Sequence, residues 1–311
     1  MMKHYSVLLQ ESIEGLHIQE DGIYVDGTLG RGGHSREILK RLTTGHLYAL
    51  DRDIEAIQES AQYLQEISHQ VTFIHTNFSN VKEKLSQFGV DEIDGMMLDL
   101  GVSSPQFDEA SRGFSYRFDA RLDMRMDQSQ KLSAYDIINT YDYHELVHIF
   151  YRYGEEDYAK QIARKIEQRR AIHPIQTTFE LVDVIKSALP AKVLNRKGHP
   201  AKKVFQAIRI AVNDELGELE TVLEDALSML KVGGRLCVIS FQSLEDRIVK
   251  ETFMKVSRAK QIDKRIPVLA SEIETPPYRV ITKKPIVATE KELEENNRSH
   301  SAKLRVIERI R

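Results

Sequence analysis

The first hundred residues alternate between short apolar runs and segments with the apolar spacing of helices. The apolar runs occupy residues 23–26, 46–51, 71–75 and 93–98. Between them, residues 33–42, 54–64 and 81–88 place apolar side chains every three or four positions, as amphipathic helices do. Strands that alternate with helices form βαβ units with parallel pairing and right-handed crossovers. The pattern therefore predicts an α/β fold with a doubly wound sheet.

This alternation stops after Leu100 and resumes near residue 235. A stretch rich in Gly, Ser, Asp and Arg covers residues 102–126, and helical spacing without strands follows at 144–153, 155–168 and 179–188. The spacing then predicts one long helix over 204–230, bent at Gly217, and further elements at 235–240, 244–256, 278–282 and 303–310. We expect a sheet domain made of residues 1–108 and 206–311, interrupted by a helical domain at 109–205.

Composition narrows the class of protein. The chain has 311 residues, of which 41% are hydrophobic and 29% charged, as in a globular enzyme. Its net charge is −3, so any contact with nucleic acid must come from local basic patches. The single cysteine, Cys237, excludes an internal disulfide and fits a reducing cytosol. The apolar run at Val7–Leu9 is too short for a signal peptide, and none approaches the ~20 residues of a membrane span, so we expect a cytoplasmic protein without membrane association.

A glycine-rich loop, "VDGTLGRGGHS", lies at the first predicted strand–helix turn, where open α/β sheets bind nucleotides. Gly30, Gly32 and Gly33 would let the backbone turn tightly and approach a ligand. Asp51 ends the next strand 21 positions after Gly30 (51 − 30), the spacing of a carboxylate that binds ribose hydroxyls. Asp26 precedes the glycines, and the loop has no G-x-G-x-x-G, which favours S-adenosylmethionine over a dinucleotide.

Two further strand ends carry candidate chemistry. Asn77 and Phe78 follow the third strand, where the ring could stack on an adenine or simply pack in the core. The fourth strand ends in "DLGVSSPQFD", beginning at Asp99. This stretch resembles the Asp/Asn/Ser-Pro-Pro-aromatic box of enzymes that methylate exocyclic amines of cytosine or adenine, although it has one proline and its aromatic residue, Phe107, comes one place late.

The residue types in this box suit that chemistry. An exocyclic amine is a weak nucleophile, because its lone pair is delocalised into the ring. Hydrogen-bond acceptors aimed at the N–H groups localise the lone pair and stabilise the positive charge that develops as the methyl group arrives. We therefore assign catalysis to Asp99 together with Ser103, Ser104 and Pro105. The same stretch could instead be a structural N-cap.

Two basic stretches favour binding to RNA. The first interleaves cations with aromatic rings and the second precedes the long predicted helix, and rings can stack on bases while cations bind phosphates. They are "RGFSYRFDARLDMRMD" and "RKGHPAKKVFQAIRI". The candidate RNA contacts are Arg112, Phe114, Arg117, Arg196, Lys202 and Lys203.

Several motifs together make the sequence resemble one family. They are "GTLGRGGHS", "DLGVSSPQ", "RGFS", "LDMRMD", "YGEE", "HPAKKVFQAIRIAVNDEL", "SLEDRIVK" and "SAKLR", in this order. The chain resembles the RsmH (MraW) family of bacterial 16S rRNA cytosine-N4-methyltransferases over nearly its whole length. The resemblance implies S-adenosylmethionine-dependent methylation of a cytidine N4 in the decoding region, in the small ribosomal subunit.

The resemblance also implies a Rossmann-like class I methyltransferase sheet with an inserted helical domain, and leaves open whether the protein is a homodimer. The cofactor positions that it implies are Gly32, Gly33, His34, Asp51, Phe78, Asp99 and Gln106. This moves Asp99 towards cofactor contact as well as catalysis.

One position departs from the family. Gln242 stands where the family often has histidine, which excludes a histidine base there. A base is not required, because the methylated amine becomes acidic enough to lose its proton to water. His34 could act as a base, but the resemblance favours cofactor contact or loop structure. No Cys/His cluster has metal-ligand spacing, so we expect no metal.

Two other functions compete. The glycine loop alone would suit a nicotinamide-dependent oxidoreductase, against which the missing G-x-G-x-x-G counts. The basic and aromatic stretches alone would suit a non-catalytic RNA-binding or assembly factor, against which the cofactor positions count.

Overall fold

A computed structural model describes residues 6–100, 109–259 and 275–311. The chain divides into two compact units. The sheet unit comprises Met1–Gly101 and Gly217–Arg311, and the helical unit comprises Val102–Leu216.

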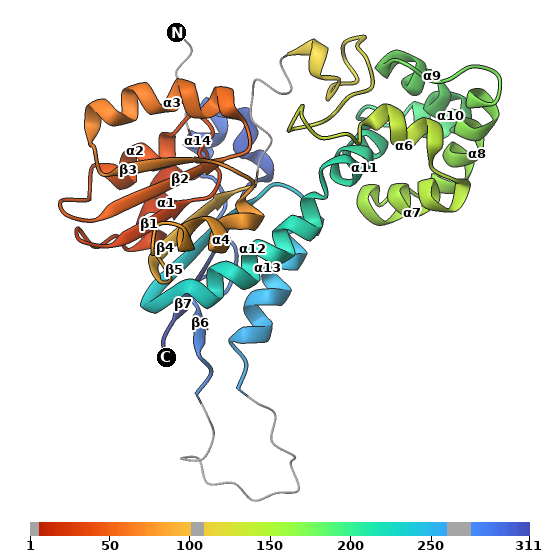
Figure 1. The fold of residues 1–311 in the computed structure, drawn as a ribbon. Coiled ribbons are helices and arrows are strands. Elements are labelled where there is room, and N and C mark those ends of the chain that lie inside the picture. The colour runs from red at the N-terminus through yellow and green to blue at the C-terminus, as the bar shows by residue number, and fades with distance from the viewer. Residues whose placement is uncertain (1–5, 101–108, 260–274) are drawn as a thin grey trace, which may run out of the picture. The chain divides into compact units, whose positions relative to one another are not determined.

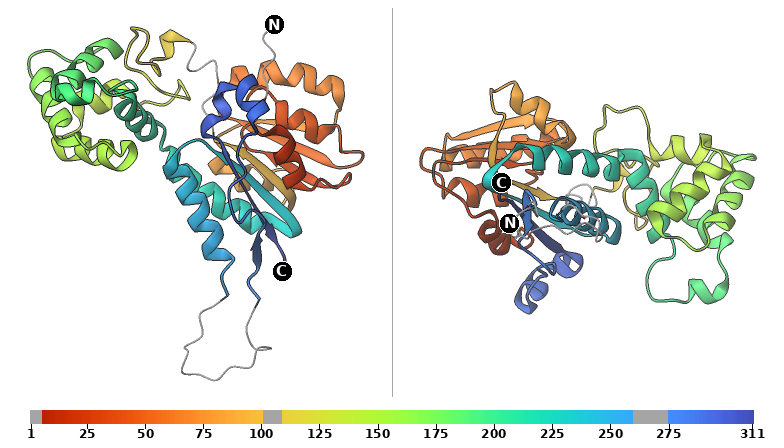
Figure 2. Two further views of the ribbon diagram at one scale, coloured as in Figure 1. Left: turned by 180° about the vertical axis from the view of Figure 1, so that it is seen from behind. Right: turned by 90° about the horizontal axis from the view of Figure 1, so that it is seen from below.

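A seven-stranded sheet forms the first unit, in the order β3-β2-β1-β4-β5-β7-β6 (Figure 1). Its strands β1 to β5 are parallel, whereas β7 runs antiparallel to both β5 and β6, with β6 at the edge (Figure 2). The chain progresses outwards from β1 through β2 to β3, and then returns to place β4 on the other side of β1. The strands are β1 (Ile23–Asp26), β2 (His46–Asp51), β3 (Val71–His75), β4 (Ile93–Asp99), β5 (Leu230–Ser240), β6 (Tyr278–Val280) and β7 (Lys303–Arg309).

Helices cover both faces of the sheet. Because successive residues of a strand point to opposite faces, they pack into two different core clusters. Val25 belongs to one core cluster and Tyr24 to the other, and Met96 and Met97 divide in the same way. The first cluster includes side chains of α4 (Val81–Ser86), α12 (Glu215–Met229) and α13 (Ser243–Val256). The second includes those of α1 (Leu9–Leu16), α2 (Gly33–Leu39) and α3 (Ile54–Ile67). The predicted α/β fold with a doubly wound, Rossmann-like sheet is confirmed.

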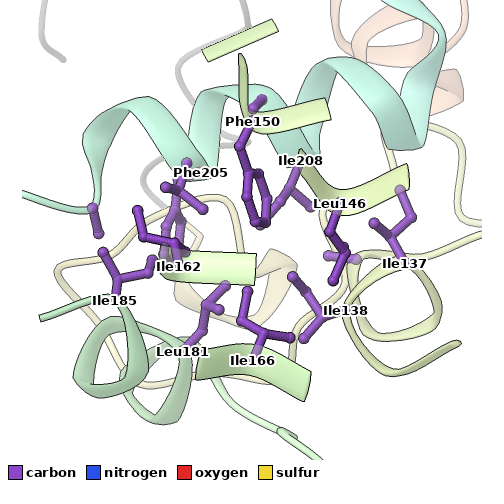
Figure 3. Close-up of a cluster of buried hydrophobic side chains, with 14 of the residues drawn as sticks. Ile137, Ile138, Leu146, Phe150, Ile162, Ile166, Leu181, Ile185, Phe205 and Ile208 are labelled. Atoms are coloured by element: carbon purple, nitrogen blue, oxygen red, sulfur yellow. The ribbon is translucent and has the colours of Figure 1, made fainter. Parts of the chain in front are cut away.

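The helical unit has a core of its own. Phe150, Ile162, Leu181 and Phe205 converge in it from four helices (Figure 3). Side-chain caps fix where several helices begin: Ser133 caps α6 and Asp142 caps α7, each within a capping box. The unit contains η2 (Ala110–Arg112), α6 (Ala134–Thr140), α7 (Tyr143–Gly154), α8 (Ala159–Arg170), α9 (Thr178–Ala188), α10 (Ala191–Leu194) and α11 (Lys202–Asn213).

The prediction of one continuous helix over 204–230 is wrong. Asp214 adopts a left-handed conformation with φ 46°, which separates α11 from α12. The side chain of Asn213 accepts a hydrogen bond from Met126 N (2.8 Å) and donates one to Met124 O (2.8 Å). The end of α11 is therefore fixed by a loop distant in sequence, before the bend expected at Gly217. The helix expected over 155–168 also begins later, at Ala159, because Glu155 is left-handed.

None of the helices in the described ranges combines the length and apolarity that crossing a bilayer requires. The single cysteine, Cys237, is buried on β5, where burial strongly raises the pKa of its thiol.

The motifs "SLEDRIVK" and "SAKLR" meet in an ion-pair cluster. The Asp246 carboxylate of α13 accepts hydrogen bonds from Arg305 Nε (2.7 Å) and Lys303 Nζ (3.2 Å), both on β7. Burial alone would raise the pKa of Asp246, but the hydrogen bonds from Arg305 and Lys303 outweigh it and hold the pKa below its usual value. The cluster therefore joins α13 to the antiparallel strand.

Replacing this arginine tests the cluster. Arg305→Ala should lower the free energy of unfolding by about 1–2 kcal/mol at pH 7, because it leaves a half-buried carboxylate with one cation. Asp246 has its pKa depressed by folding, so its contribution is present above its unfolded pKa and is lost as pH falls through the folded one. Urea titrations should therefore show the difference from wild type shrinking below about pH 4. Arg279→Ala, which removes an exposed pair with Glu308, is the control and should cost far less; equal losses would contradict the prediction.

Candidate active site

Asp26 fixes the start of the glycine loop. Its carboxylate is buried at the end of β1, where Oδ2 accepts from the Ser35 hydroxyl (2.7 Å) and Oδ1 from Thr28 N (3.1 Å). Burial raises the pKa of Asp26, and these hydrogen bonds oppose the rise. Because Ser35 lies in α2, the carboxylate joins the two ends of the loop, so Asp26 shapes the loop from inside.

The glycines are required mainly by the protein itself. Gly30 and Gly32 have positive φ, 49° and 67°, in the left-handed region that favours glycine. A Cβ on Gly32 would meet the Tyr63 hydroxyl, and one on Gly33 would overlap the hydroxyl of Ser6. Around Gly30 the nearest atom to such a Cβ is Thr28 O at 3.8 Å. Close approach at Gly32 and Gly33 is therefore to neighbouring side chains, and Gly30 presents the open side of the loop.

Asp51 is tied directly to the loop. Its Oδ2 accepts from Gly30 N (2.8 Å) and its Oδ1 from Asp53 N (2.9 Å), so the carboxylate bridges the end of β2 and the glycine turn. Burial raises the pKa of Asp51, with the two backbone hydrogen bonds opposing it. The predicted pairing of loop and carboxylate is thus a direct contact, and the half-buried side chain has remaining acceptor capacity.

A polar cluster surrounds Phe78, which begins the short helix η1 (Phe78–Asn80). The Arg52 guanidinium lies 5.4 Å from the ring centroid and pairs with Glu218 (2.7 Å). Asn77 donates from its amide to the same Glu218 carboxylate. Phe78 itself is half-buried against the core. The Asn77 amide is thus engaged within the protein. Arg52 and Glu218 belong to the same cluster, although no motif in the sequence indicated them.

Asp99 ends β4 beside the same loop. Its backbone N donates to the Thr28 hydroxyl (2.7 Å), so the last residue of β4 is fastened to the glycine turn. Strand order places β4, β1 and β2 side by side, and their carboxyl ends carry Asp99, Asp26 and Asp51. The structure therefore brings the predicted carboxylates to one edge of the sheet, where such folds bind ligands.

His34 is buried in the first turn of α2, with Nε2 3.2 Å from the carbonyl oxygen of Val7. Burial lowers the pKa of His34, and the charge of Asp99 partly opposes this. A carbonyl only accepts, so Nε2 carries a proton in this hydrogen bond. His34 is therefore a weak base held by the protein.

The other predicted catalytic positions, Ser103, Ser104 and Pro105, and the predicted cofactor position Gln106 lie outside the described residues. Gln242 follows β5 as the N-cap of α13. The backbone N atoms of Phe241 and Gln242 donate to Glu245 Oε2 (2.9 and 3.1 Å), which fixes this strand end.

Two of the predicted RNA contacts are inside the helical unit. Arg112 is buried and donates from Nη2 to the carbonyls of Arg125 (3.1 Å) and Met126 (3.0 Å). Phe114 is buried in the core of the same unit. Arg112 and Phe114 thus hold the loop before α6 together, a structural role that their pattern in the sequence does not distinguish from RNA binding.

The remaining predicted RNA contacts, Arg117, Arg196, Lys202 and Lys203, are exposed. Lys203 differs from the others, because its Nζ donates to the carbonyl oxygen of Glu155 (2.7 Å). Glu155 is the C-cap of α7, so this lysine satisfies a backbone group at the end of a helix.

Known proteins are similar to this chain over nearly its whole length. The model of the MraW methylase family matches residues 1–310. A protein of Limosilactobacillus fermentum is 56% identical, over 99% of this chain and 98% of its own length, and one of Exiguobacterium sibiricum is 54% identical, over 100% and 99%. Each is named "Ribosomal RNA small subunit methyltransferase H", as is a 55% identical protein of Lactiplantibacillus plantarum, matched over 99% of this chain and 98% of its own length. The chain belongs to the MraW methylase family.

Proposed function

We propose that this methyltransferase transfers a methyl group from S-adenosylmethionine to the exocyclic N4 amine of a cytidine in the decoding region of 16S rRNA. The relatives' names support the small-subunit rRNA as substrate, and the Asp99–Gln106 box supports an amine as acceptor. The observation that carries the proposal is the joining of two strand ends to one loop, Asp51 to Gly30 and Asp99 to Thr28.

The residues at this edge fit the cofactor. Gly30 leaves the loop open on one side, and the Asp51 carboxylate beside it can accept hydrogen bonds from ribose hydroxyls. Phe78 offers an aromatic ring next to the end of β3. S-adenosylmethionine supplies an electrophilic methyl group when bound. His34 and Gln106 complete the proposed cofactor set, His34 by fixing the first turn of α2 from its buried position.

The chain's own chemistry is the activation of the amine. Asp99 accepts a hydrogen bond from the amine N–H, which makes the nitrogen lone pair more available and offsets its developing positive charge. Ser103, Ser104 and Pro105 are proposed to add acceptors. His34 is buried and its ring is hydrogen-bonded to the Val7 carbonyl, so we propose that the proton leaves to water and not to this histidine.

The test is mass spectrometry of nucleosides from small subunits that lack the modification, after incubation with the pure protein and labelled S-adenosylmethionine. Label in N4-methylated cytidine is the expected result. Label in another nucleoside would refute the assignment to N4 of cytidine. RNA binding without label would favour a non-catalytic role, and binding of NAD(H) in calorimetry would favour an oxidoreductase.

We further propose that the helical unit recognises RNA, with Arg117, Arg196 and Lys202 on phosphates. Arg117→Ala and Lys202→Ala should each weaken RNA binding and reduce the slope of log K against log salt by about 1, because each removes one phosphate contact. Lys203→Ala is the matched control, since its ammonium already binds the Glu155 carbonyl. Salt titrations by fluorescence anisotropy measure the slopes. Unaltered slopes in the first two variants would exclude these contacts.

The cytoplasmic location stays a prediction, and the resemblance leaves the homodimer open.

A further inference from the structure

The helical unit contains a solvent-open pocket of about 220 Å³ along α9. Its lining residues come from α9 and from two loops distant in sequence. They are Tyr116, Phe179, Val182, Asp183, Lys186 and His199.

One wall of this pocket is a rigid aromatic platform. The rings of Tyr116 and His199 stack, with centroids 4.2 Å apart and planes inclined by 10°. Tyr116 also meets Phe205 of the core edge-on, at 5.7 Å. Nδ1 of His199 accepts from Ala201 N (3.2 Å), which fixes its ring. Burial lowers the pKa of His199, and Lys186 and Arg117 lower it further, so the ring is neutral at pH 7.

Phe179 provides a second aromatic surface, which is exposed to solvent. Its side chain lies in the first turn of α9 and the residue is 43% exposed, whereas Val182 one turn later is buried. Its backbone N donates to Asp119 Oδ1 (3.3 Å), which attaches this turn to the loop that carries Tyr116. An exposed ring beside a stacked pair of rings offers π faces to a flat ligand.

The charges around the pocket select the kind of ligand. Lys186 is an exposed cation that lines the pocket together with His199, and Arg117 is an exposed cation that follows Tyr116 in the chain. Asp183 places a carboxylate in the lining, which disfavours a phosphate there and offers an acceptor to N–H groups of a base edge. Aromatic faces within the pocket and cations at its rim match a nucleotide whose base enters the pocket and whose phosphates stay at the rim.

We propose that this pocket holds one unpaired base of the RNA substrate by stacking, with Lys186 and Arg117 on the adjoining phosphates. The inference rests on the proposed function for the identity of the RNA, and it adds a site for affinity rather than for chemistry.

Phe179→Ala in the full chain tests the pocket. Binding of a short fluorescein-labelled single-stranded RNA of mixed sequence, followed by anisotropy, should weaken about tenfold, and Phe179→Tyr should retain affinity. Tyr151→Ala is the control, because Tyr151 is a 71% exposed aromatic of α7 outside the pocket. An RNA of equal length with abasic residues should bind wild type as weakly as the intact RNA binds Phe179→Ala. Equal affinity of Phe179→Ala and Tyr151→Ala, or full affinity of the abasic RNA, would overturn the proposal.

Methylation of small subunits separates this proposal from the function beneath it. Phe179→Ala should raise KM for subunits and leave kcat unchanged. N4 methylation by wild type, with unaltered RNA affinity and KM in Phe179→Ala, would refute the pocket and keep the function. Loss of RNA affinity in Phe179→Ala, with no N4 methylation by wild type, would keep the pocket and refute the proposed function. Lys186→Ala provides a second variant, which should weaken RNA binding and flatten its salt dependence.

Discussion

Asp51→Ala is expected to weaken the binding of S-adenosylmethionine by about 1–3 kcal/mol, or about 5-fold to 150-fold in Kd. The carboxylate accepts from Gly30 N and Asp53 N, and we propose that it also accepts from ribose hydroxyls. Its removal thus deletes a ligand contact and frees the glycine turn at the same time. Isothermal titration calorimetry with S-adenosylmethionine and with S-adenosylhomocysteine measures the change.

A neighbouring carboxylate supplies the control. Asp53 caps α3, accepting from Glu55 N (3.0 Å), and Asp53→Ala should cost about 1 kcal/mol of stability. Its effect on cofactor affinity should be small, because the bond between Asp51 and Gly30 remains. Equal losses of affinity in the two variants would show that Asp51 acts only through the stability of this region.

The alternation of short apolar runs with helical segments predicted the sheet well, because both faces of the sheet are buried. Val25 and Tyr24 show why: each strand residue packs against one helical layer or the other, so short apolar runs mark the strands. The spacing between Gly30 and Asp51 was informative for a similar reason, since adjacent parallel strands bring their ends together. These features depend on local sequence and on general rules of topology.

Other features depend on contacts that local sequence does not contain. The apolar spacing continues past Asp214, and the break there is fixed by bonds from Asn213 to Met124 and Met126. An RNA-binding surface and a tightly hydrogen-bonded loop can have the same sequence pattern of interleaved cations and rings. The burial of Arg112 could therefore not be predicted from the sequence. The antiparallel direction of β7 likewise leaves no mark on its apolar pattern.

Asp99→Asn is expected to lower kcat about 10²-fold to 10³-fold at saturating cofactor and subunits, if the carboxylate stabilises positive charge on the reacting amine. Asparagine keeps the size and one acceptor oxygen but loses the negative charge. The bond between Asp99 N and Thr28 belongs to the backbone, so the end of β4 should stay attached to the loop. Single-turnover rates with small subunits give the chemical step directly.

Asp94→Asn is the control, because it removes a carboxylate charge from the opposite end of the same strand, β4. Asp94 accepts from Ile23 N and Lys231 Nζ, each at 2.8 Å, so its replacement should reduce stability and leave kcat near wild type. For Asp99→Asn, a loss of cofactor affinity as large as the loss of kcat would assign the carboxylate to cofactor binding. A normal kcat would instead assign the activation of the amine to hydrogen-bond acceptors within residues 103–106, which follow the end of β4. A fall in kcat alone would mean that the negative charge of Asp99 acts in the transition state, as an acceptor for a nitrogen that becomes positive requires.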